Sequence, residues 1–123
     1  MKGGVILKTV PSGISISSDD IIAIMTAFEL VDLYPMDDEN QAMINRLCCK
    51  SASSKLLTQE RAFAPNELRM ISVAVTCAFE YLSGHLPELL VPPALKSKLS
   101  PHFFTYNRLS KEFEKMIEDR HLR

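Results

Sequence analysis

The apolar residues of the chain recur mostly at helical spacing. Between residues 21 and 34, apolar residues occupy 11 of 14 positions, and the polar residues Thr26, Glu29 and Asp32 recur at every third position. Residues 68–82 have 11 apolar positions of 15. This density is typical of helices that are buried over most of their circumference. The pattern therefore predicts two highly apolar helices at the centre of the fold.

Both of these helices have start signals in the sequence. Ser17 is followed three residues later by Asp20, a variant of the capping box, in which side-chain and backbone groups bond reciprocally. The second helix begins with Pro65 at its first position and Glu67 at its third, and Gly84 suits its end. The two starts align at a shift of 47 residues. Either an internal duplication or a shared capping solution explains that alignment.

Weaker patterns predict the remaining elements. Two short β-favouring runs flank a Pro-Ser-Gly turn near the N-terminus and indicate a hairpin. A second helix is expected to begin at Asp37 or Asp38, to continue past Leu47 and to fray in the serine cluster 51–54. Prolines indicate a short helix at 93–99. A final amphipathic helix restarts at Ser100-Pro101, with apolar residues at Phe103, Tyr106, Phe113, Met116 and Ile117.

Together these elements predict a mainly α fold: a four- to five-helix bundle with a short N-terminal β-hairpin. A length of 123 residues suits one domain. We expect residues 1–16 to form the hairpin or an extended arm, and residues 17–123 to form the helical body. Two helices this apolar must be covered on several sides, and a homodimer or a protein partner would supply that cover. The alternative is a five-element bundle in which these two helices form the centre and no apolar surface is left over.

Targeting and redox signals are sparse. The apolar run at the N-terminus is cut at Lys8, and no stretch of about 18 apolar residues occurs. We therefore expect a cytoplasmic protein without a membrane span. Cys48, Cys49 and Cys77 lack C-x-x-C or Cys/His ligand spacing, which predicts reduced thiols, no metal and no cofactor.

The formal charge of −1 conceals a block arrangement. No basic residue lies between Lys8 and Arg46, whereas seven acidic residues do. One hypothesis is an acidic patch that binds a basic partner protein. The alternative is that these acids cap helix starts and pair with the chain's own basic residues. The predicted patch consists of Glu29, Asp32, Asp37, Asp38 and Glu39.

A basic segment with interleaved aromatic residues raises a second hypothesis, contact with single-stranded nucleic acid. Cations there would follow the phosphates while rings stack on bases. The near-zero net charge argues against a dedicated nucleic-acid binder. The candidate contacts are Lys96, Lys98, Arg108 and Lys111, with Phe103, Phe104 and Tyr106 among them.

Catalytic motifs are absent from the sequence, including nucleophile elbows, Walker loops and glycine-rich dinucleotide turns. A small enzyme with a pocket near His85 and His102 stays as a further alternative. The favoured interpretation is a small cytosolic protein-interaction or regulatory protein, an inhibitor or adaptor without enzymatic activity. It would bind through apolar helix faces and the acidic patch, as a dimer.

Overall fold

The computed structural model describes residues 5–7, 14–33, 38–60, 62–86 and 91–119, and it is mainly helical, as the pattern predicts. Strands β1 (Val5–Leu7) and β2 (Ile14–Ile16) pair antiparallel, with Val5 opposite Ile16. The Pro-Ser-Gly turn expected between them lies outside the described residues. The helices are α1 (Ser18–Val31), α2 (Glu39–Leu57), α3 (Pro65–Leu82), α4 (Pro93–Leu99) and α5 (Phe103–Asp119), and the short 3-10 helix η1 (Ser100–His102) precedes α5.

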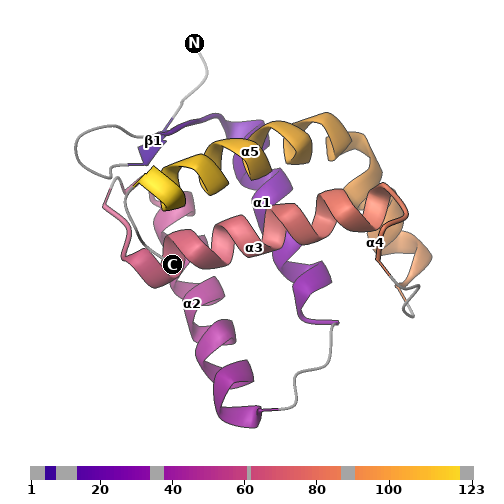
Figure 1. Cartoon of the computed structure of the whole chain (residues 1–123), viewed down its shortest axis with the longest axis horizontal. Helices are drawn as coiled ribbons and strands as arrows, with labels where there is room; N and C mark the ends of the chain where they lie inside the picture. The colour runs from indigo at the N-terminus through magenta and orange to yellow at the C-terminus, as the bar shows by residue number, and fades with distance from the viewer. Residues whose placement is uncertain (1–4, 8–13, 34–37, 61, 87–90, 120–123) are drawn as a thin grey trace.

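Helix α3 lies at the centre of the packing. It contacts α1, α2 and α5, and Figure 1 shows α5 running alongside it while α1 crosses behind. The buried faces of α1 and α3 meet the apolar face of α5 in one core. No helix among the described residues is both long enough and apolar enough to cross a membrane. The core includes Ile24, Leu30, Leu68, Ile71, Val75, Tyr106 and Phe113.

The capping box at Ser17 forms as the sequence predicts, and α3 has the carboxylate half of one, because its N-cap Ala64 offers no side-chain acceptor. The Ser17 hydroxyl accepts from the backbone N–H of Asp20 at 3.2 Å, and the Asp20 carboxylate accepts from the backbone N–H of Ser17 at 3.0 Å. At the start of α3, Glu67 Oε1 accepts from the backbone N–H of Ala64 at 2.7 Å. Gly84 follows α3 with φ +79°, a left-handed conformation that glycine adopts without steric cost.

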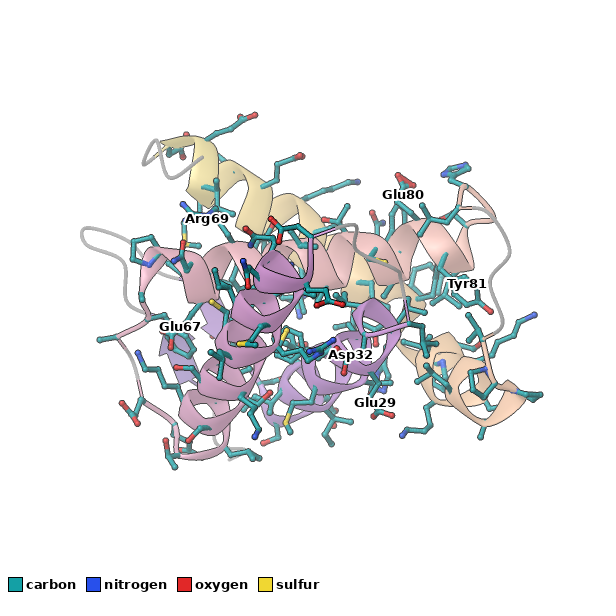
Figure 2. The ribbon with its side chains drawn as sticks, turned by 90° about the horizontal axis from the view of Figure 1, so that it is seen from below. Glu29, Asp32, Glu67, Arg69, Glu80 and Tyr81 are labelled. Carbon is teal, nitrogen blue, oxygen red and sulfur yellow. The ribbon has the colours of Figure 1, made fainter. Side chains whose placement is uncertain are left out.

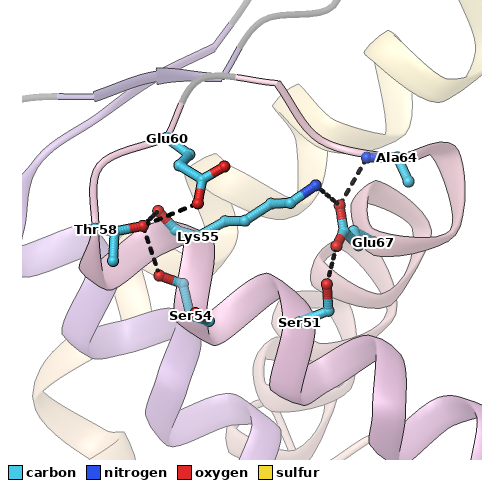
Figure 3. A network of polar contacts seen from close by, with 7 residues as sticks. All are labelled: Ser51, Ser54, Lys55, Thr58, Glu60, Ala64 and Glu67. Carbon is cyan, nitrogen blue, oxygen red and sulfur yellow. Dashed lines mark hydrogen bonds and ion pairs between the residues drawn. The ribbon is translucent and has the colours of Figure 1, made fainter.

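Both capping carboxylates are buried, and each binds a basic side chain from another helix. Arg108 Nη2 of α5 lies 2.6 Å from Asp20 Oδ1. Lys55 Nζ of α2 lies 2.8 Å from Glu67 Oε1, and the Ser51 hydroxyl donates to the other Glu67 oxygen (Figure 3). A buried carboxylate is costly unless it is paired and hydrogen-bonded, so these partners fix where α5 and α2 dock.

The predicted fraying of the second helix at residues 51–54 is wrong. Helix α2 continues through this serine cluster to Leu57, and its buried residues, Ala52 and Leu56, lie in this part. The physical reason is tertiary contact. Ser51 and Lys55 bond to Glu67, sixteen and twelve residues further along the chain, and the helix is held there despite its weak local propensity.

Helix α1 also differs from its predicted outline. It ends at Val31 with Asp32 as its C-cap, short of the predicted end at Tyr34, and residues 34–37 lie outside the described part. Thr26 belongs to the polar stripe of this helix but is buried, and its hydroxyl donates to the carbonyl of Ile22 at 2.8 Å. Because Thr26 satisfies its hydroxyl within the helix, it can face the core.

We expect Glu67→Gln to lower the free energy of unfolding by about 1–3 kcal/mol, because Lys55 then loses its charged partner. Burial alone would raise the pKa of Glu67, but hydrogen bonds from Lys55 and Ser51 outweigh it and hold the pKa below its ordinary value of 4.5. A lowered pKa in the folded state stabilises the fold above the ordinary pKa. This stabilisation is lost as the pH falls through the lower, folded-state pKa.

Urea unfolding of both proteins at several pH values measures this difference. It should be largest at neutral pH and should shrink below about pH 4.5. Glu60→Gln is the matched control, because Glu60 is exposed at the edge of the same network and its carboxylate accepts a hydrogen bond from the exposed hydroxyl of Thr58. A Glu67 variant as stable as the control, or a difference that does not change with pH, would contradict the assignment.

Candidate functional site

The first thirteen residues of α2 extend from the body with little cover. Within residues 39–51, which we call the α2 arm, no side chain is buried. The arm is about 20 Å long at 1.5 Å per residue, and Figure 1 shows it projecting away from α3. Three large apolar side chains on it are about half exposed: Met43 (57%), Ile44 (48%) and Leu47 (59%). These residues are available for contact with another molecule.

One side of the arm faces α1 across an open groove of about 700 Å³, which we call the α1/α2 groove. Its apolar lining consists of Phe28 from α1 and Met43, Leu47 and Leu57 from α2. Charged residues of both signs line it as well: Glu29 and Asp32 from α1, and Arg46 and Lys50 from α2. The groove therefore combines an apolar floor with a balanced charged rim.

The structure divides the predicted acidic patch among three roles. Glu29 and Asp32 lie together at the α1/α2 groove, as Figure 2 shows, and Glu29 is paired with Lys98 of α4 at 3.0 Å. Asp38 caps α2 by accepting from the backbone N–H groups of Asn40 and Gln41. Glu39 is exposed in the first turn of the arm. Asp37 lies outside the described residues.

The predicted nucleic-acid segment is spread over α4 and α5. Lys98 binds Glu29, and Arg108 binds Asp20 at 2.6 Å and Glu112 at 3.4 Å, so both cations already have acidic partners. Lys96 and Lys111 are exposed. The cationic surface offered to a phosphate backbone is correspondingly reduced.

The aromatic residues of that segment serve mainly the core. Tyr106 is buried and donates to the carbonyl of Ala23 at 2.7 Å, which ties α5 to α1. Phe103 stacks on Phe79 of α3 with 5.4 Å between ring centroids. Phe104, by contrast, is 80% exposed. Stacking on several successive bases needs a row of exposed rings, and in the described segment only Phe104 is largely exposed.

The two candidate histidines line neither the α1/α2 groove nor two other hollows in the described part of the chain, a groove between α3 and α5 and a small pocket near Gly84. His85 Nδ1 lies 2.9 Å from the Glu80 carboxylate at the surface, and the His102 ring meets the Tyr106 ring edge-on at 6.0 Å. Among the described residues, no group of His, Cys, Asp and Glu side chains is arranged to hold a metal ion.

A second groove, of about 490 Å³, runs between α3 and α5. It collects the polar stripe of α3, which the sequence pattern places on one line: Arg69, Ser72, Thr76 and Glu80. Figure 2 shows Arg69 and Glu80 toward opposite ends of this helix. Val73, Cys77 and Ile117 supply apolar walls. Charged residues of both signs line this groove too, but no described helix projects beside it with large apolar side chains exposed, so the α1/α2 groove is the stronger candidate site.

Cys49 lies within the α1/α2 groove and reports on its environment. Burial, together with the negative charge of Asp32, raises the pKa of its thiol to about 11. An ordinary cysteine has a pKa of 9.0, so the thiolate fraction of Cys49 at pH 8 is about 100-fold smaller than that of an ordinary cysteine. The thiolate is the reactive form. Cys49 is thus an unreactive thiol in a surface groove.

In a Cys48→Ser, Cys77→Ser background, we expect alkylation of Cys49 at pH 8 to be about 100-fold slower than that of an unstructured cysteine peptide. The rate should keep rising with pH to about 11. Asp32→Asn should lower this pKa and speed the reaction, whereas Glu29→Gln serves as the groove-rim control. Mass spectrometry of the alkylated peptide measures the rate. A plateau near pH 9 would contradict the burial of this thiol.

Comparison with known proteins adds no information about the α2 arm or the α1/α2 groove. The chain was compared with protein-family models, with curated proteins and with solved structures, and none of them matches it. Its function is therefore inferred from the α2 arm and the α1/α2 groove.

Proposed function

We propose that this chain is a cytoplasmic protein-interaction module, an inhibitor or adaptor that acts by binding a partner protein and catalyses no reaction itself. The observation that carries the proposal is the α2 arm, whose large apolar side chains are exposed although the chain has a well-filled core. In this proposal the 123 residues form a single helical-bundle domain, and the arm with the α1/α2 groove is its binding surface.

The geometry of the arm suits helix-in-groove recognition. In that mode an amphipathic helix lays its apolar face into a groove, using anchors spaced three and four residues apart. Met43 and Leu47 have this spacing, and Phe28 and Leu57 extend the apolar surface along the groove. Complete burial of such a side chain stabilises a complex by about 1.5–3 kcal/mol. Met43 and Leu47 are about half exposed, so burying the exposed part of each supplies a fraction of that free energy.

Charges on the arm and its groove add selectivity to this apolar contact. Asp32 and Glu39 offer acidic groups to a basic partner, and Arg46 and Lys50 offer basic groups close by. Rim charges of this kind contribute more to association rate and to the choice of partner than to affinity. The predicted acidic patch is thus proposed as one half of a mixed rim.

A photo-crosslinking amino acid at position 47 tests the proposal in cells that express the chain. We expect discrete crosslinked products at Leu47, because the arm is in contact with a protein there, and far fewer products from the same probe at Phe104, which is also exposed. A Met43→Ser substitution should reduce crosslinking at 47 while changing stability by about 0.5 kcal/mol or less, because Met43 is exposed. Equal, diffuse labelling from both positions would contradict the proposal.

A further inference from the structure

We propose that the protein bound by the α2 arm is a second copy of this chain, with the two arms packed antiparallel about a two-fold axis. This inference rests on the proposed function and names its partner. Its basis is the distribution of charge along the arm, which is acidic at one end and basic at the other.

The apolar residues of the arm set the register of this pairing. A two-fold axis makes the same patch meet itself, so a residue that contacts a second residue is contacted by that residue in return. Placing Met43 against Leu47 of the second copy brings four large apolar side chains together at the axis. All four are exposed in the single chain.

The same register brings unlike charges together without further adjustment. Antiparallel pairing of Met43 with Leu47 sets Asn40 opposite Lys50 of the second copy, and Glu39 is the neighbour of Asn40. Glu39 of each copy therefore lies beside Lys50 of the other, which gives two equivalent ion pairs. Both residues are exposed, and neither has a hydrogen bond or ion pair within the described part of the chain.

This charge pattern distinguishes a second copy from other occupants. A nucleic acid needs a uniformly basic surface, and a strongly basic protein needs a uniformly acidic one. The arm carries a negative charge at its N-terminal end, on Glu39, and positive charges toward its C-terminal end, on Arg46 and Lys50. An antiparallel copy of the arm places opposite charges side by side. Antiparallel packing also sets the N-terminal end of each arm beside the more C-terminal part of the other, which favours the helix dipoles.

The α1/α2 groove provides room for the incoming arm. Met43 and Leu47 belong to both the arm and the groove, so an arm that covers them also lies along Phe28 of α1. Asp32 on α1 then lies near the incoming arm, which carries Arg46 and Lys50. By symmetry each arm lies in the groove of the other copy, and α1 and α2 of the two copies form a four-helix arrangement.

Sedimentation velocity of the purified chain tests the proposal. From about 1 µM to about 500 µM, the range in which a small interface dissociates, we expect the mass to rise from 13.8 kDa toward twice that value. Leu47→Asp should hold the chain at the monomer mass. Phe104→Asp, at a still more exposed apolar position outside the arm, should leave association unchanged.

Charge reversal tests the antiparallel register. Glu39→Lys and Lys50→Glu should each weaken association about ten-fold, because each places like charges together twice. The double variant should restore association to near the original strength. Glu39 and Lys50 lie about 16 Å apart along one helix, so contact within a single arm does not account for such a rescue. The rescue is therefore specific to pairing between arms.

A chain that stays at 13.8 kDa at every concentration would overturn the proposed self-association. A double variant that fails to recover association would overturn the antiparallel register. The proposed function fails differently, because it requires crosslinks at Leu47 to some protein. Crosslinks from Leu47 to a protein other than this chain, together with a monomer at every concentration, would keep the binding module and reject the second copy.

Discussion

A buried carboxylate at the start of α3 determines how the rest of the molecule is arranged. Glu67 is 5% exposed, and it accepts hydrogen bonds from the backbone of Ala64, from Ser51 and from Lys55. A group of this kind destabilises a fold unless all its partners are in place. The C-terminal part of α2 must therefore lie against the first turn of α3, and the N-terminal part of α2 is carried outward by the straight course of the helix.

The function proposed for the chain follows from this anchoring. A helix held at one end by a part-buried ion pair presents its other end as an arm that is already helical, so binding does not have to order it from a coil. The corresponding contact at the other capping box, between Asp20 and Arg108, holds α5 against α1. Two ion pairs with buried carboxylates thus hold the body together, while Met43 and Leu47 remain exposed on the α2 arm.

Local signals in the sequence predicted much of the fold. The start of α3 at Pro65, its end before Gly84 and the bounds of α4 depend on caps and prolines, which act within a few residues. The apolar face of α5 follows from spacing alone. The alignment at a shift of 47 residues places Asp20 on Glu67, but Arg108 and Lys55 do not correspond under that shift. This favours a shared capping solution over a duplication.

The site was harder to predict, because it depends on contacts between distant parts of the chain. Met43 and Leu47 have the spacing of a buried helix face, and only the packing of the helices shows that no described element covers them. The serine cluster 51–54 resembles a loop in the sequence. Its helical structure could not be predicted, because the bond from Ser51 to Glu67 that supports it spans sixteen residues. The sequence does contain seven acidic residues and no basic one between Lys8 and Arg46. These residues nevertheless serve as caps, ion-pair partners and groove rim, which residue order alone does not distinguish.

We infer that α2 consists of an anchored end and a binding end. Hydrogen exchange of its backbone amides, measured at low and high protein concentration, tests this most directly. We expect the amides of residues 52–57 to be strongly protected at both concentrations, whereas those of residues 43–51 should be weakly protected in dilute solution and gain protection as the concentration rises. Uniform protection along α2 that does not change with concentration would contradict this inference.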